Sequence, residues 1–163
     1  MRLFLAQRAF IDDYETLRAD FAPCLEGRWR TPESLHATAL FLGDRFEPER
    51  IVRTVASLAL DLDDAPIEGT DRFTHNRIFY AGADHPSLAS TSRRLAEAFG
   101  LTPRRRFVTH VTLMRYKQID PDCFERKKTA WEHRKIGTVS GPLILMKSTL
   151  LPTGAVYEPL HIF

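Results

Sequence analysis

The sequence predicts an α+β fold of antiparallel sheets with helices on the outside. Two observations lead to this prediction. Segments with helical spacing of apolar residues alternate with short apolar segments typical of strands, and several of these strands are joined by tight turns rather than long crossovers. The length of 163 residues, 44% of them apolar, fits one globular domain spanning residues 1–163, with a core that needs no disulfide, metal or obligatory partner to be stable.

The first half of the chain is expected to hold two strands and two helices. Arg2–Gln7 forms the opening strand, and the helix after it ends at Pro23. Leu35–Leu42 is a buried strand, and Pro48 then opens a second helix. The apolar positions at helical spacing are Phe10, Tyr14, Leu17 and Phe21 in the first helix and Ile51, Val52, Val55, Leu58 and Leu62 in the second.

The second half repeats a strand, helix and strand order. Residues 74–76 are the expected tip of a hairpin, and Gly100 and Pro103 end a third helix with Leu88, Leu95 and Phe99 inward. The remaining expected elements are a strand at Phe107–Tyr116, a short helix near 121–131, and a closing pair of strands at 143–151 and 155–163. This repeated order of elements predicts two pseudo-repeated lobes.

The two cysteines predict neither a disulfide framework nor a zinc site. Cys24 and Cys123 lie far apart, without a Cys-x-x-Cys motif or a nearby pair of histidines, so both are expected to be buried or inert thiols. The first residues contain too short an apolar run for a signal peptide, and no segment approaches the ~18 apolar residues of a membrane span. We therefore expect a cytoplasmic protein that does not bind membranes.

Charge is unevenly distributed along the chain although the net charge is only +2. Residues 1–92 carry 10 Lys and Arg against 15 Asp and Glu, whereas residues 93–135 carry 12 against 5. The total excludes a protein held to nucleic acid by bulk charge. The basic segment, which includes Arg104, Arg105 and Arg106, could guide a nucleic-acid backbone or be a solvated face.

A His-x-Thr motif occurs once in each half, at His36–Thr38 and at His110–Thr112. Both copies interrupt apolar predicted strands, where a polar pair is costly unless it is satisfied or used. Residues two apart in a strand share a face, so each motif presents an imidazole beside a hydroxyl. Two histidines can supply a general acid and a general base, and the threonines can donate hydrogen bonds to phosphoryl oxygens.

With these motifs and their surroundings, the chain resembles the 2H phosphoesterases, and among them the RNA 2′,3′-cyclic phosphodiesterases, also called 2′-5′ RNA ligases. The similarity runs from Met1–Ala6 through Arg28–Gly43 to Phe107–Arg115. It implies two pseudo-symmetric lobes whose antiparallel sheets face a central cleft. Departures are small: Thr109 stands where the family often has proline, and Ala37 and Ala39 are smaller than usual.

The resemblance implies metal-independent hydrolysis of RNA 2′,3′-cyclic phosphate ends to 2′-phosphates, with possible reverse 2′-5′ ligation, by a monomer that needs no cofactor. His36 would be the proton donor and His110 the proton acceptor, with Thr38 and Thr112 in the catalytic quartet. From the residues alone, the two histidine roles could be exchanged. The family also places phosphate and base contacts at positions matching Arg115 and Phe41. Ideal alternation puts each of these on the face opposite its histidine, so both need a bulge or a strand end.

Three other functions stay open at this level. The chain could be a non-catalytic RNA-binding module, a 2H phosphodiesterase acting on small cyclic nucleotides or 2′-5′ linked oligonucleotides, or a divalent-metal hydrolase, which the histidine spacing disfavours. Outside the motifs, Trp29 is expected in the core, and His161 in the core or at a pocket edge. The other histidines, His75, His85 and His133, are expected on the surface.

Overall fold

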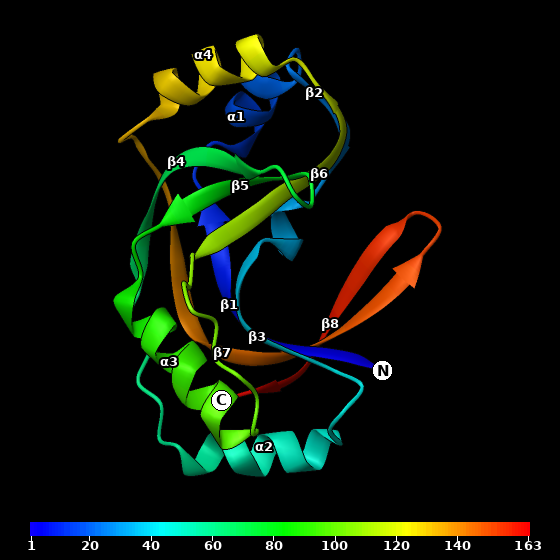
Figure 1. The fold of residues 1–163 in the computed structure, drawn as a ribbon, viewed down its shortest axis with the longest axis vertical. Coiled ribbons are helices and arrows are strands. Elements are labelled where there is room, and N and C mark those ends of the chain that lie inside the picture. Colours follow the sequence, from blue (N-terminus) through cyan, green and yellow to red (C-terminus); the bar gives the residue numbers. More distant parts are fainter.

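The computed structural model describes all 163 residues and has the expected α+β architecture, with eight antiparallel strands and four α-helices (Figure 1). The strands are β1 (Arg2–Ile11), β2 (Leu25–Trp29), β3 (His36–Gly43), β4 (Ala65–Phe73), β5 (Ile78–Ala83), β6 (His110–Ile119), β7 (Lys135–Leu151) and β8 (Gly154–Ile162). The helices are α1 (Tyr14–Phe21), α2 (Pro48–Ser57), α3 (Pro86–Ala98) and α4 (Pro121–Trp131), with a 3₁₀ turn at Pro32–Ser34.

Strand pairing joins all eight strands into one sheet, within which two groups of four strands, called lobes here, can be distinguished. The first lobe has the order β3-β1-β7-β8, and the second has the order β2-β6-β5-β4. The amino-terminal part of β7 pairs with β1 and β4 and so links the lobes. The other link is a single pair, Ala37 of β3 with Val111 of β6, and both residues are the middle positions of the His-x-Thr motifs.

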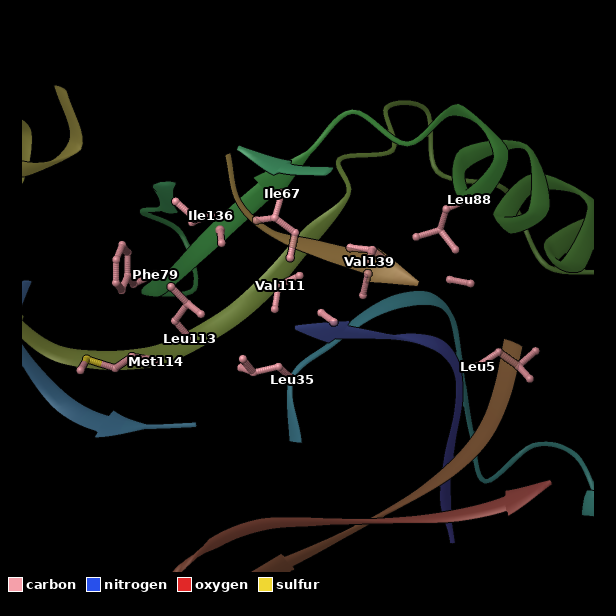
Figure 2. Close-up of a cluster of buried hydrophobic side chains, with 14 of the residues drawn as sticks. Leu5, Leu35, Ile67, Phe79, Leu88, Val111, Leu113, Met114, Ile136 and Val139 are labelled. Carbon is pink, nitrogen blue, oxygen red and sulfur yellow. The ribbon is translucent and has the colours of Figure 1, made fainter. Parts of the chain in front are cut away.

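The helices cover the outside of the sheets. Helices α2 and α3 lie at one end of the molecule, whereas α1 and α4 lie at the other (Figure 1). Proline in the first turn of α2, α3 and α4 fixes where each begins, and Asp13 and Asp120 accept backbone hydrogen bonds at the starts of α1 and α4. One hydrophobic core runs through both lobes, from Leu5 and Leu88 to Phe79 and Met114 (Figure 2).

Most predicted elements are present, but several bounds differ. Phe10, placed in the first helix, lies in β1, which runs on to Ile11. Helix α2 ends at Ser57, before Leu62, and β6 begins at His110 rather than at Phe107.

Strand β2 was not anticipated, because its five residues include Glu26, Arg28 and only two large apolar side chains. Strand β7 begins at Lys135 rather than at residue 143, because its first part bridges β1 and β4. None of the helices has the length and apolar character needed to cross a bilayer.

The prediction of free thiols is wrong, because a disulfide joins Cys24 to Cys123, whose Cα atoms lie 5.3 Å apart. The cause is the unanticipated strand. Pairing of β2 with β6 brings Leu25 opposite Ile119, and the Asp120 amide donates to the Cys24 carbonyl at 2.9 Å. The first turn of α4, which carries Cys123, therefore begins beside Cys24.

Candidate functional site

The two His-x-Thr motifs lie side by side at the contact between the lobes. Because Ala37 pairs with Val111 in an antiparallel ladder, the same register sets Thr38 opposite His110 and Thr112 opposite His36. Ala37 and Val111 are fully buried, whereas the four motif side chains on the other face are partly exposed. Directly opposite residues have Cβ atoms about 5 Å apart. The structure thus brings the predicted quartet together on one face, called the site face below.

Both histidine rings are held by the same kind of hydrogen bond, from Nδ1 to a backbone carbonyl two residues earlier. Nδ1 of His36 lies 2.8 Å from the carbonyl oxygen of Ser34, and Nδ1 of His110 lies 2.9 Å from that of Val108. A carbonyl can only accept, so Nδ1 carries the proton in both rings. Each neutral imidazole therefore has its Nε2 lone pair free to accept a proton, and each imidazolium has an Nε2–H to donate.

A β-bulge follows each motif at the same position, three residues after the histidine. On β3, Leu40 pairs with Leu5 and Thr38 with Ala6, which leaves Ala39 as the extra residue. On β6, Met114 pairs with Phe79 and Thr112 with Tyr80, which leaves Leu113 as the extra residue. An extra residue reverses the alternation of side chains beyond it.

The bulges turn Phe41 and Arg115 onto the site face, as their predicted roles require. Phe41 pairs with Phe4, two residues from the partner of Thr38 on the same strand. Arg115 pairs with Ile78, two residues from the partner of Thr112. Phe41 is 57% exposed although it is a large apolar side chain, and Arg115 is exposed as well. Neither side chain is part of the core, so both are available to a ligand.

Aromatic side chains that the sequence did not single out surround each histidine. The His36 ring lies 5.0 Å from both the Phe4 and the Tyr157 rings, measured between centroids. The His110 ring lies 5.1 Å from Phe73 and 5.7 Å from Tyr80. No local motif marks these residues, since they come from four other strands and reach the site only through strand pairing.

Burial among these rings lowers the pKa of both histidines. The pKa of His36 falls to about 4, chiefly because burial disfavours the imidazolium, with smaller contributions from Arg30 and His110. Burial also lowers the pKa of His110, and Arg104 adds to that shift. In the free protein both imidazoles are therefore neutral near pH 7. An anion bound beside them would raise both pKa values.

The remaining predicted residues lie away from the quartet. Trp29 packs against the core, as expected. His75 and His133 are exposed, as expected, and His161 is exposed at the edge of a cavity of about 550 Å³ beside α2. The surface placement of His85 is wrong: it is 3% exposed, and its Nε2 lies 2.7 Å from Oε1 of Gln7. Its Nδ1 accepts from the Leu88 amide, so His85 caps α3.

The chain nowhere gathers three or more His, Cys, Asp or Glu side chains in an arrangement that could hold a metal ion. Arg104 and Arg105 line a separate hollow of about 320 Å³ with Arg93 of α3. Two segments of the predicted basic region therefore meet beside the strand that carries His110.

Comparison with known proteins identifies solved structures that share this fold. No protein-family model matches the sequence, and no curated protein matches it either. Among solved structures, TT0787 of Thermus thermophilus is 25% identical with a TM-score of 0.66, over 100% of this chain and 97% of that chain. E. coli LigT complexed with 3′-AMP is 20% identical with a TM-score of 0.74, over 99% and 96% of the two chains. A structure described as a phosphoesterase is 20% identical with a TM-score of 0.70, over 99% and 96%. The chain therefore has the fold of the 2H phosphoesterases, the family that its paired His-x-Thr motifs resemble.

Proposed function

We propose that this protein hydrolyses RNA 2′,3′-cyclic phosphate ends to 2′-phosphate ends without a metal ion. The observation that carries the proposal is the pairing of two identical His-x-Thr motifs across β3 and β6, each with its imidazole Nε2 free. Cyclic phosphodiester hydrolysis needs one group to remove a proton and one to supply a proton on opposite sides of phosphorus. Two imidazoles flanked by hydroxyl donors meet that need.

In the proposed reaction, Nε2 of His110 accepts a proton from water as the water oxygen bonds to phosphorus. The bond between phosphorus and the ribose 3′-oxygen breaks, and Nε2–H of His36 donates its proton to that oxygen. The Thr38 and Thr112 hydroxyls donate to the non-bridging oxygens, whose charge Arg115 offsets. The products are a 2′-phosphate and a free 3′-hydroxyl, and one proton has moved from His36 to substrate and one from water to His110.

The pKa of His36 bears directly on this assignment. At about 4 in the free protein, it leaves the proposed donor neutral near pH 7. The proposal therefore requires the phosphodiester anion to stabilise the His36 imidazolium on binding. With the substrate in the same orientation and the roles exchanged, the 2′-oxygen would leave and the product would be a 3′-phosphate.

The same groups could run the reaction in reverse and so join RNA ends. An RNA 5′-hydroxyl in the place of water would give a 2′-5′ linkage without ATP. Solved LigT structures are described as complexes with 3′-AMP, ATP and NADP⁺, which supports a nucleotide-like ligand for this site. A monomeric protein acting on RNA ends in the cytoplasm completes the proposal. Disulfides are rare in the cytoplasm, so finding Cys24 and Cys123 oxidised or reduced in the cell tests the proposed location.

Alanine substitution of each histidine tests the proposal. We expect His36→Ala and His110→Ala to lower kcat for a nucleoside 2′,3′-cyclic phosphate by at least about 100-fold each, because acid or base catalysis is lost. His133→Ala, at an exposed position between α4 and β7, is the matched control and should keep full activity. Activity of the unmodified protein should persist in EDTA. Full activity of His110→Ala, or complete inhibition by EDTA that Zn²⁺ reverses, would contradict the proposal.

A further inference from the structure

Strand β2 and the residue that follows it add two arginines to the site face beyond the quartet. Arg28 pairs directly with Arg115 across β2 and β6, while Trp29 next to it pairs with buried Met114 and points into the core. Arg30 follows β2 directly and reaches the site, where its charge contributes to the lowered pKa of His36. The amide of Arg30 donates to the Leu113 carbonyl at 2.8 Å, which keeps this end of β2 against β6.

The hairpin of β7 and β8 lies against these arginines. The Arg30 guanidinium carbon is 5.6 Å from the centre of the Tyr157 ring, and the same ring packs edge-on against His36. Near the hairpin turn, Gly154 has a φ of +121°, and a Cβ placed there would lie 2.8 Å from Nη1 of Arg28. The hairpin thus forms a wall along the arginines that begins beside His36.

The three arginines have no carboxylate partner. The ion pairs of the chain are Arg18 with Glu15, Lys127 with Asp20, and Lys128 with Asp71, all outside this group. Like charges directly opposite each other in a sheet are destabilising, so an anion bound between Arg28 and Arg115 would relieve an unfavourable pair. Unpaired cations held against a hairpin wall therefore indicate a site for an anionic ligand.

The cations also extend further than one phosphate requires. Because of the bulge at Leu113, Arg115 lies two ladder positions beyond Thr112, about 7 Å along the strand, and Arg28 is opposite Arg115. A terminal cyclic phosphate at the quartet needs one cation, which the long side chain of Arg115 can supply. Arg28 and Arg30 are then left for a second phosphate along the substrate.

We propose that Arg28 and Arg30, with the β7–β8 hairpin, bind the phosphodiester that precedes the terminal nucleotide, and so make the protein selective for oligonucleotides over mononucleotides. This inference rests on the proposed function. Arg30 is held in place by stacking on Tyr157, and Arg28 by its position between Arg115 and Gly154. Both are specificity-determining residues, and neither takes part in proton transfer.

The test compares kcat/KM for a tetranucleotide ending in a 2′,3′-cyclic phosphate with that for the same terminal nucleoside 2′,3′-cyclic phosphate. We expect Arg28→Gln and Arg30→Gln each to lower the ratio of the two values by about tenfold, since a hydrogen bond from a cation to phosphate is lost. Arg28→Lys should recover part of the ratio. Arg50→Gln is the matched control, because Arg50 stacks on Phe46, with 4.9 Å between the guanidinium carbon and the ring centre, in the segment at the start of α2.

Salt dependence gives a second readout that a purely structural role would not change. Each phosphate contact to a single strand contributes a slope of about −0.7 in log affinity against log salt concentration. Arg28→Gln should therefore make the slope shallower by about 0.7 for the tetranucleotide and leave the mononucleotide slope unchanged. Equal losses for both substrates, or an unchanged ratio, would overturn this inference and leave the proposed function standing. Turnover of neither substrate by the unmodified protein would overturn the proposed function, and this inference with it.

Discussion

Breaking the Cys24–Cys123 disulfide is expected to lower the free energy of unfolding by several kcal/mol. The two cysteines are 99 residues apart, so the bond closes a large loop in the unfolded chain. Loop-closure entropy for a loop of this size corresponds to about 4.7 kcal/mol at 25 °C. Cys24 is 2% exposed, and reduction leaves a thiol there without removing any side-chain heavy atom. Comparing oxidised and reduced protein therefore isolates the effect of the cross-link.

The assay is urea unfolding with and without a phosphine reductant. With a slope of at most about 3 kcal/mol per molar urea, a loss of about 4.7 kcal/mol moves the midpoint down by more than about 1 M. The double variant Cys24→Ala/Cys123→Ala is the control, and its midpoint should not respond to the reductant. Identical midpoints for oxidised and reduced protein would refute the reasoning. Two reactive thiols in the unreduced, denatured protein would refute the disulfide itself.

Three further predictions concern packing, substrate contact and pH. Gly137→Ala should lower Tm by roughly 10 °C in thermal unfolding, which corresponds to a loss of about 3 kcal/mol in the free energy of unfolding. The reason is that a Cβ at residue 137 would lie 1.9 Å from the Phe10 carbonyl oxygen. An unchanged Tm would contradict this close approach. Phe41→Ala should leave Tm unchanged but raise KM for a cyclic-phosphate substrate about tenfold, since an exposed ring that stacks on a base is lost; an unchanged KM would exclude stacking. Burial lowers the pKa of both His36 and His110, and the reaction needs one of them protonated. A plot of kcat/KM against pH should therefore fall about tenfold per pH unit on its alkaline side, with a midpoint below pH 6.5. A midpoint above pH 7 would contradict the lowered pKa values.

The quartet could be predicted from the sequence because its signal is local. A histidine and a threonine two residues apart in an apolar strand share a face whatever the rest of the chain does. The positions of Phe41 and Arg115 could not be derived that way, since they depend on bulges at Ala39 and Leu113. Neither position carries the glycine that often marks a bulge, so only strand pairing reveals it.

Features that depend on long-range pairing were mispredicted or missed. Cys24 and Cys123 meet only because β2 pairs with β6, and the charged composition of β2 concealed that strand. A histidine directly before a proline, as His85 is before Pro86, favours a surface turn, but His85 is buried against Gln7 of β1, 78 residues away. The contact of Tyr157 with His36 likewise requires β8 to return along β7.

Product analysis of a single turnover tests the central claim most directly. An oligonucleotide ending in a 2′,3′-cyclic phosphate is incubated with the protein in EDTA, and the phosphate position is assigned by ³¹P NMR. The account predicts a 2′-phosphate end, produced with His36 as the proton donor and His110 as the proton acceptor. A 3′-phosphate end would contradict departure of the 3′-oxygen, and an unchanged cyclic phosphate would contradict the proposed reaction.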